Sequence, residues 1–183
     1  PFDDRKVTID TGDMGVLTFS GHGSSGPVGS WDDITPSANE ESWGTSIGGT
    51  VDGATNAAAY DNGFIYDYAV ADGISLMAAY DPSKGTDLQS STEIGIAYTG
   101  MEGLTVGYAA GEYNSEGGTS NSDRTTMYIK YAYGPVTVGY QESEIDSNKA
   151  TTDDEFEAMG ITYQVNDDLT IGYNESTYKD AAT

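Results

Sequence analysis

The chain has 183 residues and a formal net charge of −23, because 30 acidic residues outnumber 7 lysines and arginines. Such a charge argues against nucleic acid as a partner, since binding to phosphates requires a cationic surface. The absence of cysteine excludes disulfides and thiolate metal sites, and the single histidine, His22, leaves no histidine cluster for zinc. The acidity would concentrate cations around the protein, although it is equally typical of high solubility or adaptation to salt.

Pairs of strand-like segments separated by short turns recur along the chain. Residues 5–10 and 16–20 form the first pair, and residues 64–70 and 74–80 form the second around Asp72-Gly73, a dipeptide typical of tight hairpins. Three further pairs complete the chain, at residues 92–99 and 104–111, 125–133 and 136–141, and 156–165 and 169–174. The sequence therefore predicts an all-β fold of about ten strands in an antiparallel, up-and-down order.

The connections alternate between turns of a few residues and polar loops of about ten residues or more. Short turns are therefore expected at one end of the sheet and long loops at the other. Three strands that leave short turns repeat one pattern: Leu104-Thr-Val-Gly-Tyr108, Val136-Thr-Val-Gly-Tyr140 and Leu169-Thr-Ile-Gly-Tyr173. Each repeat belongs to a hairpin, so the repeats predict a meander rather than a solenoid. A long meander has to close or be covered, because free strand edges promote aggregation.

Side-chain alternation in these repeats predicts the environment of each face. Leu104, Val106 and Tyr108 share one face, while Thr105 and Gly107 share the other. Small and hydroxylic residues suit a crowded or water-filled interior better than a solvent-exposed surface, where Lys, Glu and Arg are usual. The apolar face would then contact lipid. Many of the 14 tyrosines end the apolar face, as rings at a membrane interface do, although tyrosine also suits half-buried strands. Together these features favour a transmembrane β-barrel.

The longest segment without strand or helix periodicity runs from residue 21 to residue 62 and separates the first two hairpins. It is rich in Gly, Ser and Thr and contains the only two tryptophans, Trp31 and Trp43. It also carries five acidic residues: Asp32, Asp33, Glu40, Glu41 and Asp52. A loop of this length is either functional or a sign that the strand assignment is wrong.

A family resemblance rests on residues 5–19, on the long loop and on residues 60–64, Tyr-Asp-Asn-Gly-Phe. This region resembles the middle of the trimeric porins of Gram-negative bacteria, especially the α-proteobacterial type. The family's Gly-Asp-aromatic-Gly turn corresponds to residues 12–15, where Met14 replaces the aromatic residue. The resemblance implies a homotrimer in the bacterial outer membrane, in contact with outer-membrane lipids. It also implies a barrel of about sixteen strands, with about three strands before Pro1 and about three after Thr183.

In that family the third external loop folds into the lumen and narrows it. The resemblance therefore implies one incomplete β-barrel domain over residues 1–183, with residues 21–62 as a constriction-type loop. Asp32, Asp33, Glu40, Glu41 and Asp52 would form its negative rim, although each can instead be a solvated loop residue. By alternation, Lys6, Asp67 and Lys130 are expected to face the lumen. The predicted function is passive diffusion of small hydrophilic solutes and ions, with a preference for cations.

Other chemistry has weaker support in the sequence. His22 lies near Ser20 and Ser24, but no strand-turn-helix elbow or orienting acid accompanies them, so no enzyme activity is expected. No cofactor or dedicated metal site is expected, although calcium could bind the acidic loops at residues 153–155 and 32–33. The alternative function is a secreted acidic β-rich adhesin or surface-layer module, which could also bind calcium. Solubility in plain buffer, without detergent, would favour that alternative.

Overall fold

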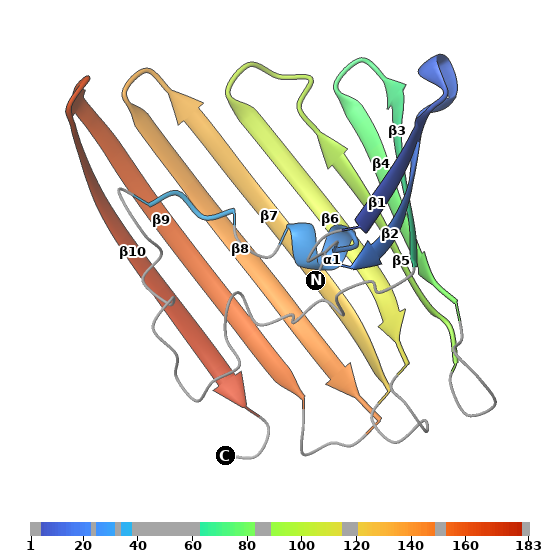
Figure 1. Ribbon diagram of the computed structural model, residues 1–183. Coiled ribbons are helices and arrows are strands. Elements are labelled where there is room, and N and C mark those ends of the chain that lie inside the picture. Colours follow the sequence, from blue (N-terminus) through green and yellow to red (C-terminus); the bar gives the residue numbers. More distant parts are fainter. Residues whose placement is uncertain are drawn as a thin grey trace.

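The computed structural model describes residues 5–22, 25–31, 34–37, 63–82, 89–114, 121–148 and 153–180. Ten strands form a single sheet (Figure 1). The strands are β1 (Arg5–Asp10), β2 (Val16–His22), β3 (Gly63–Ala71), β4 (Ile74–Asp81), β5 (Ser91–Tyr98), β6 (Leu104–Tyr113), β7 (Ser122–Tyr133), β8 (Val136–Ser147), β9 (Asp154–Asn166) and β10 (Leu169–Asp180). A 3-10 turn, η1 (Gly12–Met14), joins β1 to β2, and a short helix, α1 (Pro27–Ser30), follows β2. None of the described helical segments has the length and apolarity needed to cross a membrane.

Each strand pairs antiparallel with its neighbours in the sequence, so the sheet is a meander from β1 to β10. Its strands are tilted and the sheet is curved, and the ends joined by the short turns lie together at the top of Figure 1. Within the described residues β1 and β10 do not pair with each other, and they form the two edges of the sheet. The predicted all-β, up-and-down order of ten strands is confirmed.

The β1–β2 turn requires glycine at two positions. Gly12 and Gly15 have φ values of 67° and 88°, which residues with a side chain rarely adopt. In addition, a Cβ atom at Gly15 would lie 2.4 Å from the backbone oxygen of Asp67 on β3. The turn therefore lies directly against the third strand, where only glycine fits at position 15.

The exposure of side chains on the two faces of the sheet is the reverse of that in a water-soluble protein, where apolar side chains are buried and polar ones are exposed. On one face large apolar side chains are exposed; Ile94 and Ile171, for example, are each 59% exposed. On the other face polar side chains are buried, and Gln141 is 0% exposed. Directly opposed residues share a face, so the register extends the apolar face across the sheet through residues such as Ile9, Leu17, Tyr66, Ile96, Tyr108, Ile129, Tyr140, Met159 and Ile171. An apolar surface of this extent needs a cover other than water.

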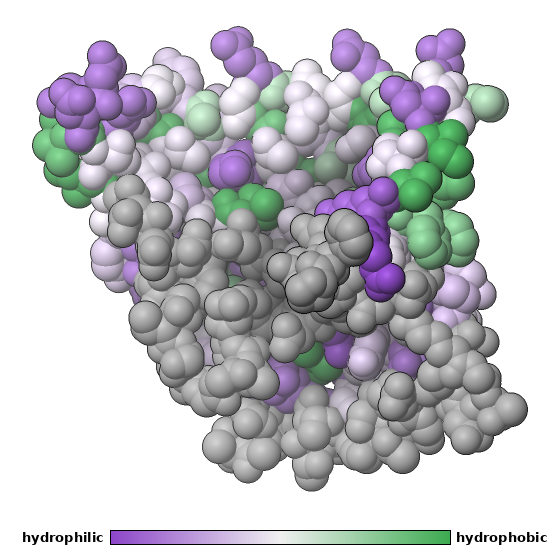
Figure 2. Space-filling model, viewed as in Figure 1, coloured by the Kyte–Doolittle hydropathy of each residue, from purple (hydrophilic) through white to green (hydrophobic). Residues whose placement is uncertain are grey.

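Figure 2 looks onto the face that carries α1 and shows hydrophilic residues along the edge formed by the short turns. Exposed residues of these turns include Asp72, Glu102 and Asp168. At the short turns the apolar face therefore ends in a row of charged residues. At the other ends of β7 to β10 the apolar face also becomes acidic, because Glu142 lies opposite Glu157 and Glu144 lies opposite Glu155.

Candidate functional site: a segment across the polar face

The described part of the long connection between β2 and β3 lies on the polar face of the sheet. We name residues 25–31 and 34–37 the inner segment. Its helix α1 contacts β4, β5, β6 and β7, and it lies in front of the sheet in Figure 1. The side chains of Pro27 and Val28 are buried in this contact. The segment therefore covers the face that bears small and polar side chains and leaves the apolar face free.

Side chains of the sheet provide hydrogen-bond partners for the backbone of the inner segment. This is required because a largely irregular segment cannot pair all of its N–H and C=O groups within itself. Three such hydrogen bonds reach β5, β8 and β10: Val28 N–H to Glu93 Oε2 (3.0 Å), Ile34 N–H to Gln141 Oε1 (2.9 Å), and the Asn174 side-chain amide to the Pro36 carbonyl oxygen (2.6 Å). Glu93 is 9% exposed and Gln141 is fully buried. The segment is thus attached at three points spread across six strands.

Glycines in the strands make room for the inner segment. A Cβ atom at Gly95 would lie 2.5 Å from the indole ring of Trp31 and 2.7 Å from Pro27. A Cβ atom at Gly139 would lie 2.5 Å from the ring of Pro36, and one at Gly160 would lie 2.4 Å from the Pro36 carbonyl oxygen. Glycine weakens a strand, so its presence here indicates close approach of another segment.

Trp31 packs against the sheet through a second aromatic residue. Its indole contacts the ring of Tyr128 on β7 edge-on, with a centroid distance of 6.0 Å and an interplanar angle of 78°. A Cβ atom at Gly107, on the neighbouring strand, would lie 2.3 Å from the Tyr128 ring. The threonine hydroxyl of Thr126 donates to the Trp31 carbonyl oxygen at 3.4 Å. The Tyr128 ring therefore lies over Gly107, and Trp31 in turn packs against Tyr128.

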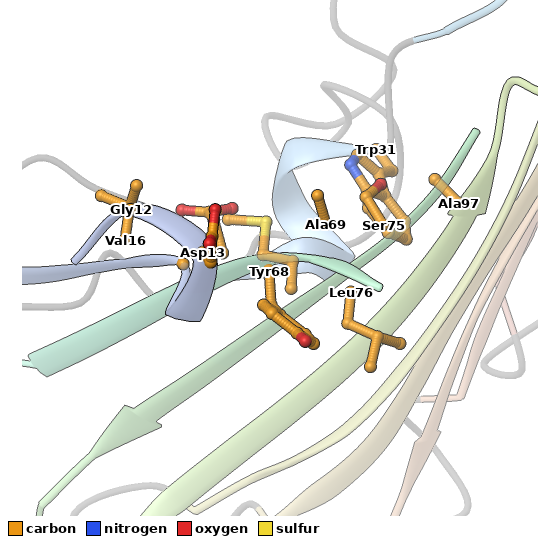
Figure 3. A pocket seen from close by; sticks show the side chains of 12 residues that line it. Gly12, Asp13, Val16, Trp31, Tyr68, Ala69, Ser75, Leu76 and Ala97 are labelled. Atoms are coloured by element: carbon orange, nitrogen blue, oxygen red, sulfur yellow. The ribbon is translucent and has the colours of Figure 1, made fainter. Parts of the chain in front are cut away.

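Two open cavities border the inner segment. The first, which we name the Asp67 cavity, has a volume of about 700 Å³ and is lined by Asp13, Val16, Asp67, Met77 and Trp31 among others (Figure 3). The second, the Lys130 cavity, has a volume of about 710 Å³. It lies beside Ile34, Thr35 and Pro36 and is lined by the side chains of Glu102, Thr105, Lys130, Thr137 and Thr162.

The register places all three residues that the alternation singled out on the polar face. Lys6 lies opposite Ser20, Asp67 lies opposite Val16 and Met77, and Lys130 lies opposite Thr105 and Gly139. That they line a lumen stays a prediction. The five acids of the expected rim, Asp32, Asp33, Glu40, Glu41 and Asp52, lie outside the described residues.

Sequence reasoning did not single out the residues that attach the inner segment. Gln141 and Asn174 each follow the Gly-Tyr pair of a repeat and carry an amide on a face of Gly, Thr and Ser. This recurrence was the available signal. No comparable sequence signal marks Glu93, because a single glutamate in a strand is usually solvated.

The acidic residues 153–155, of which the last two begin β9, do not converge on one point. Asp153 accepts a hydrogen bond from the Ser147 N–H, Asp154 accepts one from the Tyr178 hydroxyl, and Glu155 pairs with Lys179. Among the described residues no group of three or more His, Cys, Asp or Glu could hold a metal ion. Calcium binding at these loops stays a prediction.

An antiparallel meander with an apolar outer face and a polar inner face, crossed by an inserted segment, defines a wall of a transmembrane β-barrel. The family model of Gram-negative porins matches residues 2–183. The chain therefore belongs to the Gram-negative porin family, as its sequence predicts, and it is located in the outer membrane.

Solved structures show the same fold. The anion-selective porin from Comamonas acidovorans superposes with a TM-score of 0.70 at 14% identity, over 97% of this chain and 57% of that one. A loop deletion mutant of OmpT from Vibrio cholerae gives a TM-score of 0.67 at 19% identity, over 97% of this chain and 63% of that one. The chain thus spans roughly three fifths of the length of these structures. No curated protein matches it significantly in sequence.

Proposed function

We propose that the protein containing this chain forms a water-filled channel for passive diffusion of small hydrophilic solutes and ions across the outer membrane. The observation that carries this proposal is the inner segment, which is attached across the polar face by Glu93, Gln141 and Asn174. In a closed barrel this face is the lumen, so an attached segment narrows the passage and sets the size of solutes that pass. Such transport requires no catalytic group.

The channel prefers cations in this proposal. Its support is the net charge of −23 and the five acidic residues that the sequence places in the long connection. Three basic residues on the polar face favour anions instead: Lys6, Arg124 and Lys130. The Comamonas protein is described as anion-selective, so the fold alone does not impose a cation preference, and in this proposal the charges that line the passage decide it.

The apolar face contacts outer-membrane lipids, and three copies of the protein assemble through part of it. This homotrimer rests on the resemblance to trimeric porins and on the large exposed apolar side chains, which lipid or a second subunit can cover. Chemical cross-linking in mild detergent should produce a ladder that ends at the trimer. A secreted adhesin or surface-layer module has no support in the family match.

The decisive experiment is electrical. The intact protein is inserted into a planar lipid bilayer that separates two KCl solutions of different concentration. Stepwise current increases show that channels form, and the sign of the reversal potential gives the preferred ion. We expect a reversal potential of the sign that K⁺ permeation produces. A potential of the opposite sign contradicts the cation preference, and an absence of current steps contradicts the channel itself.

A further inference from the structure

We propose that the Asp67 cavity is a binding subsite for organic cations that combine an ammonium group with an apolar part. The cavity lies on the face that forms the lumen, so this inference rests on the proposed channel function. It goes further, because a preference for cations in general requires only negative charge, whereas this cavity also provides an aromatic ring and apolar side chains.

One row of side chains across the polar face builds the subsite. Directly opposed residues on β1 to β5 give the sequence Asp10, Val16, Asp67, Met77 and Gly95 along this row. Neighbouring strands lie about 4.8 Å apart, so Asp67 and Gly95 are about 10 Å apart. The indole of Trp31 stands directly above Gly95, where a Cβ atom would collide with it. Carboxylate, thioether and indole therefore follow one another within the length of a small molecule.

The cavity is bordered on two sides. Asp13 and Val16, from the β1–β2 turn and the start of β2, lie at one side, and Trp31 lies at the other with Ser75 and Ala97 nearby (Figure 3). Tyr68 and Leu76 also border the cavity, but they are opposed to each other on the apolar face and point away from Trp31. The volume of about 700 Å³ is within the range of small-molecule sites.

The negative charge of Asp67 is not neutralised by the part of the chain that the structure describes. No described residue forms a hydrogen bond or an ion pair with the Asp67 carboxylate, and no lysine or arginine lines the cavity. Asp10, in the same row, differs because its carboxylate accepts a hydrogen bond from the Gly12 N–H at 2.9 Å. Asp67 and Asp13 are therefore the carboxylates available to a ligand.

The remaining lining selects the class of cation. A metal ion requires several oxygen ligands in a defined geometry, and the described residues contain no such group. An ammonium group beside Asp67 can instead extend its apolar part over Met77, whose flexible thioether adapts to irregular shapes. The apolar part then meets Trp31, whose large ring can pack against an aromatic group of the ligand. The chemistry thus fits an amphipathic organic cation.

The subsite also depends on the inner segment. Trp31 directly follows α1, which the Val28–Glu93 hydrogen bond fixes to β5. This attachment acts together with the Thr126 hydrogen bond to the Trp31 carbonyl oxygen and holds Trp31 above Gly95, where it forms one side of the cavity. A solute that passes beside the segment therefore meets carboxylate and indole together, at the point where we propose that the passage is narrowest.

The test measures K⁺ current through the intact protein in planar bilayers while benzyltrimethylammonium is added. This cation should reduce the current, whereas benzyl alcohol, which has the ring without the charge, should not. Asp67→Asn and Trp31→Leu should each raise the half-blocking concentration by about three- to tenfold. Asp72→Asn is the matched control, because it removes the same charge from the exposed β3–β4 turn. It should leave the half-blocking concentration unchanged.

Asp67→Asn is the more direct of the two variants, because Trp31 also packs on Tyr128. If its half-blocking concentration equals that of the natural protein while the channel stays cation-selective, the subsite is wrong and the channel function stands. A second readout does not need conduction. When phenylalanine replaces every tryptophan of the intact protein except Trp31, benzyltrimethylammonium should change the fluorescence in detergent, and Asp67→Asn should abolish this change. If the fluorescence responds but no current flows, the channel function fails and the subsite stands; an unchanged fluorescence overturns the subsite.

Discussion

The buried side chain of Gln141 on β8 accepts a hydrogen bond from the backbone N–H of Ile34 at 2.9 Å. Thr35 also approaches the same oxygen, with its hydroxyl 3.5 Å away. One amide of the wall therefore fixes the inner segment near the middle of its path. Two further attachments, at Glu93 and Asn174, lie on either side of this point.

Gln141→Leu keeps the size of the side chain but removes the acceptor. The partly buried Ile34 N–H would then lose its partner, which costs about 1–3 kcal/mol if water cannot replace the acceptor. We expect the inner segment to loosen and the single-channel current to become larger and noisier. Planar-bilayer recordings check this expectation. Gln164→Leu is the control, because Gln164 on β9 is exposed and its side chain forms no hydrogen bond with the described residues of the inner segment. Equal conductance of both variants would show that Gln141 does not position the segment.

Gly95→Ala places a methyl group where the Trp31 ring lies. Because neither the strand backbone nor Pro27 can move far, we expect a loss of about 1–3 kcal/mol in stability from overpacking. The temperature at which the folded form converts to the slower-migrating form on a gel measures the loss. The same substitution in a Trp31→Ala protein should cost less, since the ring is gone. Purely additive effects would contradict the contact between the two residues.

Glu157→Gln removes one of two carboxylates that face each other on β8 and β9, where Glu142 lies opposite Glu157. Like charges directly opposite are destabilising, so this variant should gain about 0.2–1 kcal/mol, with the larger effect at low salt. Glu102→Gln, in the exposed β5–β6 turn, removes the same charge and should have no effect. Thermal conversion on a gel at two salt concentrations distinguishes them. A loss of stability in Glu157→Gln would indicate that the attraction between Lys179 and Glu157 outweighs the repulsion between the two carboxylates.

The sequence predicts the sheet well because each level of its pattern agrees with the others. Short turns such as Asp72-Gly73 fix the hairpins, and alternation such as Leu104, Val106 and Tyr108 against Thr105 and Gly107 fixes the faces. Ten strands in meander order follow from these two features, and the structure has them.

The attachment of the inner segment could not be predicted in the same way. Residues 21–62 have no periodicity, so nothing local indicates which backbone groups reach which strand. The pairing of Ile34 with Gln141 spans more than a hundred residues and depends on the curvature of the sheet. Gly139 belongs to the repeated Gly-Tyr pattern, but the reason for a glycine there, the ring of Pro36, appears only in three dimensions.

The placement of two lysines on opposite faces allows the cation preference to be tested with matched charges. Lys130 lies on the polar face and lines the cavity beside Pro36, whereas Lys179 lies on the other face and pairs with Glu155 at 2.8 Å. Lys130→Gln should increase the preference for K⁺ over Cl⁻, on the order of twofold, because a charge in a narrow aqueous passage is only partly screened.

Lys179→Gln changes the net charge by the same amount but should leave the reversal potential unchanged, because its charge is outside the passage. The two variants are compared with the natural protein in one KCl gradient. If both shift the reversal potential equally, the overall charge of the protein controls selectivity and the lining of the polar face does not. If only Lys130→Gln shifts it, the face that carries the inner segment is the one along which ions move.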